Sequence, residues 1–126
     1  MKNLKDLTRA EEEVMQILWQ INRGFVKDIL DRMPSPRPAY NTVSTIIRIL
    51  ETKGFVSHKA YGKTHEYYPL VSKDNYSRFQ LNSMLSGYFD GSFQNLVSFF
   101  AEKESLKTAE IDELLRQLQN LKKKKS

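Results

Sequence analysis

The sequence contains no cysteine, so disulfides, thiolate metal sites and thiol redox sensing are excluded for this chain. Two histidines remain as soft-metal ligands, and we expect no metal and no cofactor. No apolar run approaches the roughly 18 residues that span a bilayer, and the first six residues lack the apolar stretch of a secretory signal. We therefore expect a cytoplasmic protein without membrane insertion.

Catalytic motifs are missing as well. The sequence has no glycine-rich dinucleotide motif, Walker loop, HExxH or GxSxG signature. No nucleophile with an adjacent base stands out either. We therefore do not expect an enzyme, and 126 residues suffice for one compact domain with a helical extension.

Positive charge is concentrated in the middle of the chain. The net charge is +5, from 20 lysines and arginines against 15 acidic residues. Between Arg32 and Lys63, six cations accompany a single anion, Glu51. Such a segment suits a polyanion such as DNA, because each neutralised phosphate releases bound counterions. A solvated cationic surface would have the same composition, so charge alone leaves both interpretations open.

Three stretches of residues 1–71 repeat apolar side chains at helical spacing, and each is followed by a break. A capping box, Thr8 with Glu11, predicts the start of the first helix. The apolar stripes run over Val14–Ile21, Val26–Met33 and Val43–Leu50. Residues 55–59 and 64–68 then read as two short strands around Tyr61–Gly62. Three helices followed by a β-hairpin predict a winged helix-turn-helix domain over residues 1–71.

Residues 72–126 read as helices again and end in a basic tail, Lys122–Lys125. These helices are short, apolar and mildly acidic, which favours burial against a second copy of the chain. The residues expected to form that contact are Phe93, Leu96, Val97, Phe100, Leu114, Leu115 and Leu118. The fold class is thus mainly α with a small hairpin, a winged helix followed by a helical dimerisation domain. Packing of these helices back onto the winged helix is the alternative.

The third helix carries the candidate DNA-reading residues. Its apolar stripe leaves short hydrogen-bonding side chains and one arginine on the other face, the mixture that reads base edges and phosphates in a major groove. These residues are Asn41, Thr42, Ser44, Thr45 and Arg48. Asn41 is equally well suited to be the N-cap of this helix. In the hairpin, Lys59 and Lys63 are expected to reach phosphates beside the groove.

The two histidines flank the expected turn. If Tyr61–Gly62 is a two-residue turn, His58 and His65 face each other across the hairpin. Two imidazoles in that arrangement form either a weak metal site or an ordinary polar pair, and we favour the polar pair.

Several segments at characteristic intervals resemble the penicillinase-repressor family, the BlaI and MecI type of regulator, across nearly the whole chain. They include Ala10–Met15 with Trp19, Thr42–Ile47, Lys53–Phe55, Tyr67–Tyr68, Gly91–Phe93 and Glu110–Leu114. The resemblance implies a homodimeric repressor that binds inverted-repeat operator DNA of antibiotic-resistance genes. It also implies derepression by a sensor-linked protease that cuts the C-terminal region. The family's cut bond corresponds here to Phe99–Phe100, where the best-known members have asparagine before the cut.

A winged helix used only as a protein-interaction adaptor is the rival interpretation. It predicts no salt-dependent affinity for DNA, whereas a repressor loses affinity steeply as salt rises.

Overall fold

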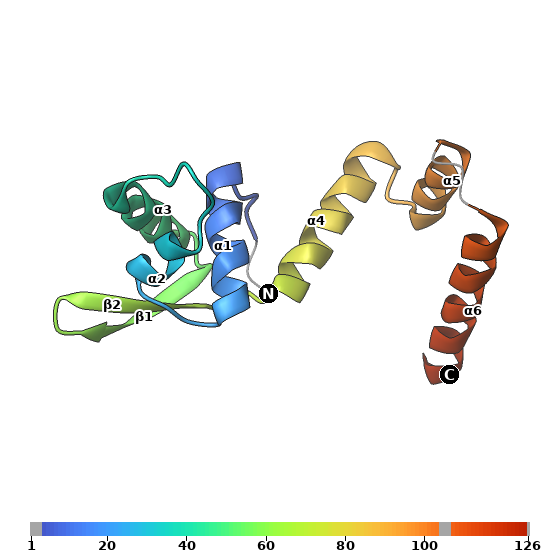
Figure 1. The fold of residues 1–126 in the computed structure, drawn as a ribbon. Helices are drawn as coiled ribbons and strands as arrows, with labels where there is room; N and C mark the ends of the chain where they lie inside the picture. Colours follow the sequence, from blue (N-terminus) through green and yellow to red (C-terminus); the bar gives the residue numbers. More distant parts are fainter. Residues whose placement is uncertain (1–3, 104–106, 126) are drawn as a thin grey trace. The chain divides into compact units, whose positions relative to one another are not determined.

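The computed structural model describes residues 4–103 and 107–125, so the first three of the six N-terminal residues considered above lie outside it. The elements run in the order drawn in Figure 1. They are α1 (Arg9–Ile21), α2 (Val26–Asp31), α3 (Tyr40–Thr52), β1 (Val56–Tyr61), β2 (Thr64–Pro69), α4 (Lys73–Tyr88), α5 (Phe93–Lys103) and α6 (Thr108–Lys125). The predicted class, helices with one hairpin, is confirmed.

Helix α1 begins at the predicted capping box. The Glu11 amide donates to Thr8 Oγ1 at 3.2 Å, and the Glu11 carboxylate accepts from the Thr8 amide at 2.9 Å. The same carboxylate accepts from Lys53 Nζ at 2.7 Å, although Glu11 is only 5% exposed. Burial alone would raise the pKa of Glu11, but the hydrogen bonds from Lys53 and Thr8 outweigh it and lower that pKa. One buried carboxylate therefore ties the start of α1 to the end of α3.

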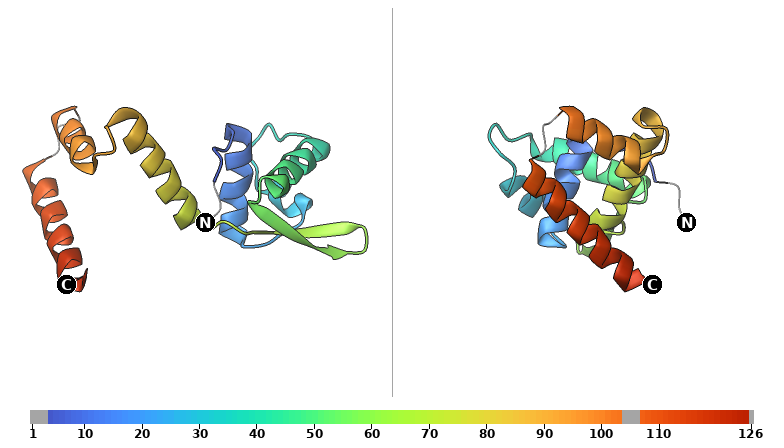
Figure 2. Two further views of the ribbon diagram at one scale, coloured as in Figure 1. Left: turned by 180° about the vertical axis from the view of Figure 1, so that it is seen from behind. Right: turned by 90° about the vertical axis from the view of Figure 1, so that its right-hand side faces the viewer.

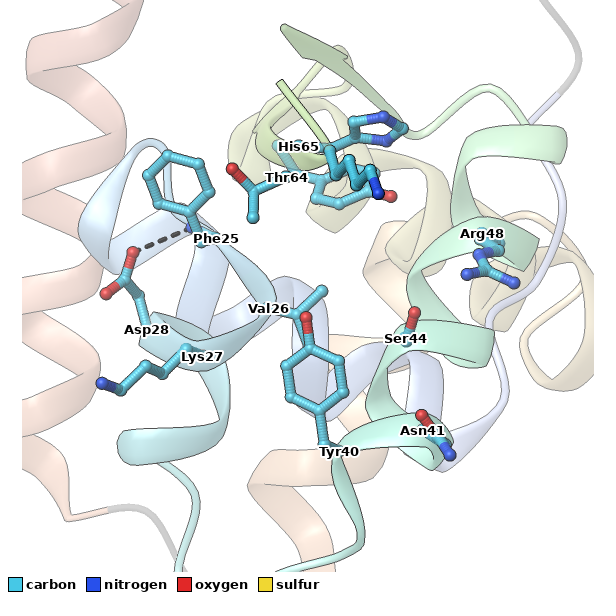
Figure 3. Close-up of a pocket in the computed structure, with 12 residues that line it drawn as sticks. Phe25, Val26, Lys27, Asp28, Tyr40, Asn41, Ser44, Arg48, Thr64 and His65 are labelled. Carbon is cyan, nitrogen blue, oxygen red and sulfur yellow. Dashed lines mark hydrogen bonds between the residues drawn. The ribbon is translucent and has the colours of Figure 1, made fainter. Parts of the chain in front are cut away.

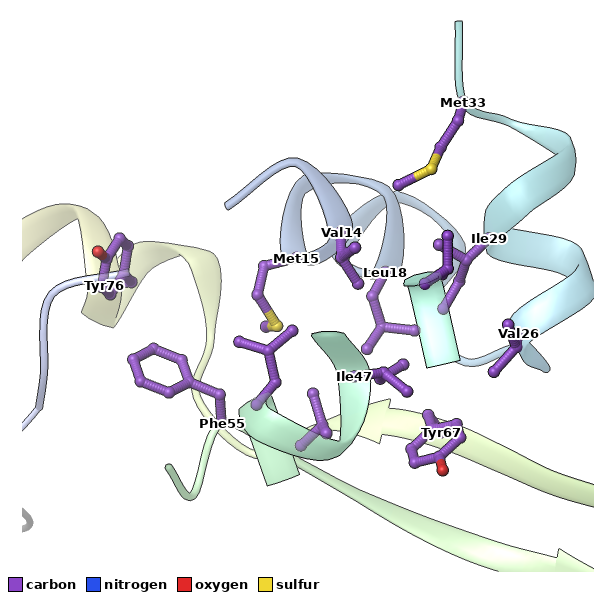
Figure 4. Close-up of a cluster of buried hydrophobic side chains, with 13 residues drawn as sticks. Val14, Met15, Leu18, Val26, Ile29, Met33, Ile47, Phe55, Tyr67 and Tyr76 are labelled. Atoms are coloured by element: carbon purple, nitrogen blue, oxygen red, sulfur yellow. The ribbon is translucent and has the colours of Figure 1, made fainter. Parts of the chain in front are cut away.

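The core lies between α1, α2, α3 and the start of the hairpin (Figure 4). Its fully buried side chains come from each of these elements. They are Val14, Met15, Leu18, Ile29, Val43, Ile47, Leu50, Phe55 and Val56. The three predicted apolar stripes therefore converge, as amphipathic helices must when none can bury a face alone.

The first turns of α4 also pack on this core. Tyr76 is buried, its hydroxyl accepts from the Leu7 amide at 3.0 Å, and its ring lies 5.5 Å from that of Phe55. The indole N–H of Trp19 donates to the carbonyl of Val71 at 2.9 Å, and the Trp19 side chain packs against the core. These contacts extend the first compact unit beyond Val71.

The chain divides into two compact units, residues 1–80 and 81–126. The predicted domain boundary after Val71 stays a prediction. Tyr76 and Phe79 of α4, which follow that boundary in the chain, pack with the first unit. In the first unit, the hairpin extends beyond the helices, as Figure 1 and the left view of Figure 2 show. None of the helices formed by residues 4–103 and 107–125 is long and apolar enough to cross a membrane.

The hairpin differs from its prediction by one residue. Tyr61 pairs with Thr64, so the turn is Gly62–Lys63 and not Tyr61–Gly62. Gly62 has a φ of +64°, and a glycine at the first of two turn positions suits the type II′ geometry of tight hairpins. The shift changes every cross-strand pair: His58 faces Tyr67, and His65 faces Ala60. The expectation that the two histidines stand directly opposite each other is therefore wrong.

Candidate nucleic-acid interface

Helix α3 presents two different faces. Val43, Ile47 and Leu50 are fully buried in the core. Four of the predicted reading residues, Asn41, Thr42, Thr45 and Arg48, are exposed, and Ser44 is half-buried. The helix therefore offers polar side chains to an outside partner while its apolar stripe fixes its position on the domain.

The structure excludes one of the two interpretations of Asn41, its role as the N-cap, and the DNA contact stays a prediction. The N-cap residue of α3 is Ala39, so Asn41 lies inside the first turn and its side chain does not cap the helix. Thr45, one turn later, donates its hydroxyl proton to the main-chain carbonyl of Asn41 at 2.9 Å. With its proton engaged, this hydroxyl is left to accept, for example from the amino group of adenine or cytosine.

The hairpin, which we call the wing, is held to the helices by the loop between α1 and α2. Gly24 and Tyr67 exchange two main-chain hydrogen bonds, of 2.9 and 2.8 Å. A Cβ on Gly24 would lie 2.7 Å from Ile21 Cδ1 and 3.3 Å from Asp28 Cβ, so a larger residue here would require the Ile21 side chain to move. The Phe25 ring also packs edge-on against Tyr61 near the wing tip, with centroids 5.9 Å apart. The loop thereby sets the position of the wing beside α3.

A cleft of about 600 Å³ lies between α2, α3 and the wing, and we call it the interface cleft (Figure 3). Helix α3 contributes Tyr40, Asn41, Ser44 and Arg48 to its lining. The start of α2 contributes Phe25, Val26, Lys27 and Asp28, and the wing contributes Lys63, Thr64, His65 and Tyr67. Asp28 is the one carboxylate among these described lining residues, and it accepts from the Phe25 amide at 2.9 Å. The cleft therefore combines three cations with hydrogen-bonding side chains, which suits a phosphodiester strand.

The cleft brings together only part of the predicted set. Asn41, Ser44, Arg48 and Lys63 line it, with Lys63 placed in the turn itself. Thr42 and Thr45 lie on α3 but do not line it. Lys59 does not line it either, and its ammonium group lies over the Tyr61 ring, 5.4 Å from the centroid. The two wing lysines are thus not equivalent.

Lys27 and Tyr40 are among the lining residues that sequence reasoning missed. Lys27 is an exposed cation on the polar side of the short α2 stripe, and its position one residue after Val26 could have indicated this. Tyr40 is 51% exposed at the first turn of α3, immediately before the predicted reading residues. Its position, directly before the polar residues predicted to read DNA, could have indicated that Tyr40 belongs to the same surface.

The two histidines of the wing lie against each other. Their rings are stacked, with centroids 4.0 Å apart and planes 7° from parallel, and His58 Nδ1 lies 2.7 Å from Glu51 Oε2. Lone pairs of parallel rings do not converge on one point, as the coordination of one ion requires. In the part of the chain that the structure describes, no group of three or more histidine, aspartate or glutamate side chains could hold a metal ion.

Tyr67 lines the cleft from the wing and is buried. Burial raises its pKa, and the Glu51 carboxylate adds to that rise while Arg48 opposes it. The phenol therefore stays protonated at neutral pH and keeps its capacity to donate a hydrogen bond.

Comparison with known proteins decides the family. Residues 7–120 match the family model described as "Penicillinase repressor". The chain belongs to the penicillinase repressor family. The methicillin resistance regulatory protein MecI of Mammaliicoccus sciuri is 32% identical over 110 residues, which cover 86% of this chain and 89% of that protein. The penicillinase repressor of Bacillus licheniformis is 29% identical over 128 residues, covering 99% and 98% of the two chains.

A solved structure supports the fold of the first unit. The solution structure of the DNA-binding domain of the repressor BlaI matches with a TM-score of 0.52 at 24% identity, covering 60% of this chain and 94% of that domain. As a member of the penicillinase repressor family, the chain is a winged-helix, DNA-binding transcriptional repressor and not an enzyme.

Proposed function

We propose that this penicillinase repressor family member binds inverted-repeat operators of antibiotic-resistance genes as a homodimer. The observation that carries the proposal is the interface cleft, where Arg48 of α3 and Lys63 of the wing line one opening. A helix in a major groove with a wing on the adjacent backbone uses this arrangement: α3 reads bases while cations beside it contact phosphates. The names of the relatives in staphylococci and bacilli support resistance genes as the targets.

The second unit supports the homodimer. Many of its large apolar side chains are substantially exposed in the single chain. They are Leu81, Met84, Tyr88, Phe93, Phe99, Phe100, Ile111, Leu115, Leu118 and Leu121. Four of the predicted dimerisation residues belong to this set, while Leu96, Val97 and Leu114 are half-buried. Such a concentration of apolar surface favours association, and a second copy is the simplest partner.

Derepression by cleavage at Phe99–Phe100 is the regulatory part of the proposal. This bond lies inside α5, and both rings are about half exposed, at 51% and 47%. A protease holds its substrate extended, so α5 must unwind before the cut. A helix of 11 residues is short enough for this, because isolated helices below about 12–15 residues are marginal in water.

Salt-dependent DNA binding tests the function against the adaptor alternative. Fluorescence anisotropy compares a labelled duplex from upstream of the repressor's own gene, carrying a dyad-symmetric site, with a scrambled duplex. Between 50 and 200 mM salt, affinity should fall by about 10³–10⁵-fold if roughly six to ten phosphates are contacted. Absence of binding to either duplex at low salt would establish the adaptor interpretation instead.

A further inference from the structure

The last helix carries an apolar stripe of the coiled-coil type. Ile111, Leu114, Leu118 and Leu121 follow one another at spacings of three, four and three residues, the pattern of heptad positions a and d. Leu115 widens the stripe. Ile111, Leu115, Leu118 and Leu121 are between 38% and 53% exposed, so the single chain leaves most of this face uncovered. A second helix laid along α6 would bury it.

Charge is segregated along the same helix. Residues 108–116 hold three acidic side chains and one arginine, a balance of 1 − 3 = −2, whereas residues 117–125 hold four lysines and no acid. Arg116 is already engaged, since its guanidinium pairs with the Glu113 carboxylate on the preceding turn. At the acidic end, Glu110 and Asp112 are exposed, and at the basic end Lys122 and Lys124 are exposed. The two ends of α6 therefore have opposite charge.

This segregation distinguishes the two ways in which two copies of α6 can pair. In a parallel pair, lysines lie beside lysines and carboxylates beside carboxylates, and the helix dipoles also repel. In an antiparallel pair, the acidic turns of one helix lie beside the lysines of the other. The apolar stripe fits this arrangement too, because Ile111 then meets Leu121 and Leu114 meets Leu118. The midpoint of the stripe falls near residue 116.

We propose that α6 pairs with α6 of a second copy in antiparallel orientation, with a two-fold axis near residue 116 and Glu110 of each copy beside Lys124 of the other. This rests on the homodimer proposed above and specifies its geometry. The basic tail then stabilises the repressor dimer by contact with the acidic turns of the other protomer. A cut in α5 would separate α6 from the winged helix and so break the link between this pair and the DNA-binding units.

Introduced cysteines test the orientation, because the chain has none of its own. The test uses two full-length variants, Ile111→Cys and Leu121→Cys, one of which carries an N-terminal tag so that the two can be distinguished. Each variant is first oxidised alone. The two are then mixed, allowed to exchange subunits, and oxidised together. Ten residues of helix span about 15 Å, whereas disulfides join Cα atoms about 4.4–6.8 Å apart. An antiparallel pair thus predicts a cross-link only between the two different chains. Cross-linking of each variant with itself would show a parallel pair and overturn the proposal.

Sedimentation of the same variants separates this proposal from the homodimer. A dimer without any cross-link in the mixture would mean that α6 does not pair with α6, and would overturn the proposed geometry alone. A monomer in the wild-type chain would contradict the homodimer itself. DNA anisotropy, measured in parallel, reports on the operator-binding function independently of both.

Charge reversal at exposed positions provides a test that leaves the apolar stripe intact. Glu110→Lys and Lys124→Glu should each weaken the dimer by roughly two- to tenfold at low salt, as expected for exposed ion pairs. The double variant should recover most of the wild-type affinity, because the two charges again match across the pair. Circular dichroism controls for loss of helix. Single variants without effect, or a double variant weaker than either single one, would overturn the proposal.

Discussion

The winged-helix unit and the C-terminal helices are built from the same kind of amphipathic helix, but their apolar faces have different surroundings. In α1 and α3, Val14, Val43 and Leu50 are fully buried. In α5 and α6, Phe93 and Leu115 remain about half exposed, at 48% and 52%. The first unit completes its own core because three helices and the hairpin surround one another. The second leaves large apolar side chains exposed in the single chain, and the proposed homodimer rests on this surface.

Removing the end of the C-terminal helical unit should have the largest effect on DNA affinity. A chain ending at Phe99 lacks α6 and the end of α5, so each winged helix should bind its half-site without a tether. Loss of the tether should weaken binding to the full palindrome by about 10²–10⁴-fold. Anisotropy on a half-site duplex is the internal control, because affinity for a single half-site should be unchanged. Full-strength binding of the palindrome by the truncated chain would show that dimerisation does not depend on α6.

Replacing a leucine by alanine should have different consequences in the two units, on unfolding in the first and on dimerisation in the second. Leu50→Ala, in the buried core, should lower the free energy of unfolding by about 2–5 kcal/mol. The neighbouring Ile49→Ala is the matched control, since Ile49 is 41% exposed and its loss should cost less than about 0.5 kcal/mol. Leu118→Ala should instead weaken the dimer and leave the winged helix intact. Urea unfolding measures the stability of the winged helix, and sedimentation measures the dimer affinity. If Leu50→Ala and Leu118→Ala destabilise the winged helix equally, the two units do not differ in this way.

The ion pair between Glu11 and Lys53 should make the stability of the first unit depend on pH. The pKa of Glu11 in the folded state lies below its ordinary value of about 4.5, so its stabilising contribution is present above that pH. The contribution is lost as pH falls through the folded-state pKa. Glu11→Gln should therefore lower the free energy of unfolding by about 1–3 kcal/mol near neutral pH, a typical value for charged hydrogen bonds.

Chemical denaturation of both chains from pH 7 down to pH 3 follows this difference. The wild type and Glu11→Gln should converge at the acidic end. A difference that stays constant over that range would show that packing, and not charge, accounts for the effect of the substitution.

Much of the first unit was predictable because its signals are local. The capping box at Thr8, the apolar stripe of α3 and the break at Lys53–Gly54 all depend on residues a few positions apart, and the structure contains each of them. The hairpin turn was misplaced by one residue because Tyr61–Gly62 and Gly62–Lys63 differ only in which position the glycine occupies.

The features of the site that could not be predicted from the sequence depend on contacts between residues far apart in the chain. The Gly24–Tyr67 bridge that positions the wing joins residues more than forty positions apart in the chain, and no periodicity indicates it. Lys59 and Lys63 are placed differently because Lys63 lies in the turn, whereas Lys59 lies on β1 with its ammonium group over the Tyr61 ring. For the same reason Tyr40 and Lys27, which line the cleft from two different helices, were missed. The predicted DNA-contact and dimerisation residues stay predictions until they are measured.

The role of Arg48 tests the central claim, that the interface cleft reads DNA, most directly. Arg48→Ala should lose about 1–3 kcal/mol more binding free energy on the palindrome than on the scrambled duplex if this residue contacts a base. Lys63→Ala should weaken both duplexes alike, as a phosphate contact does. Arg9→Ala is the matched control, because Arg9 is almost fully exposed and does not line the cleft. If Arg48→Ala and Lys63→Ala both bind the palindrome as tightly as Arg9→Ala, the cleft is not the DNA interface.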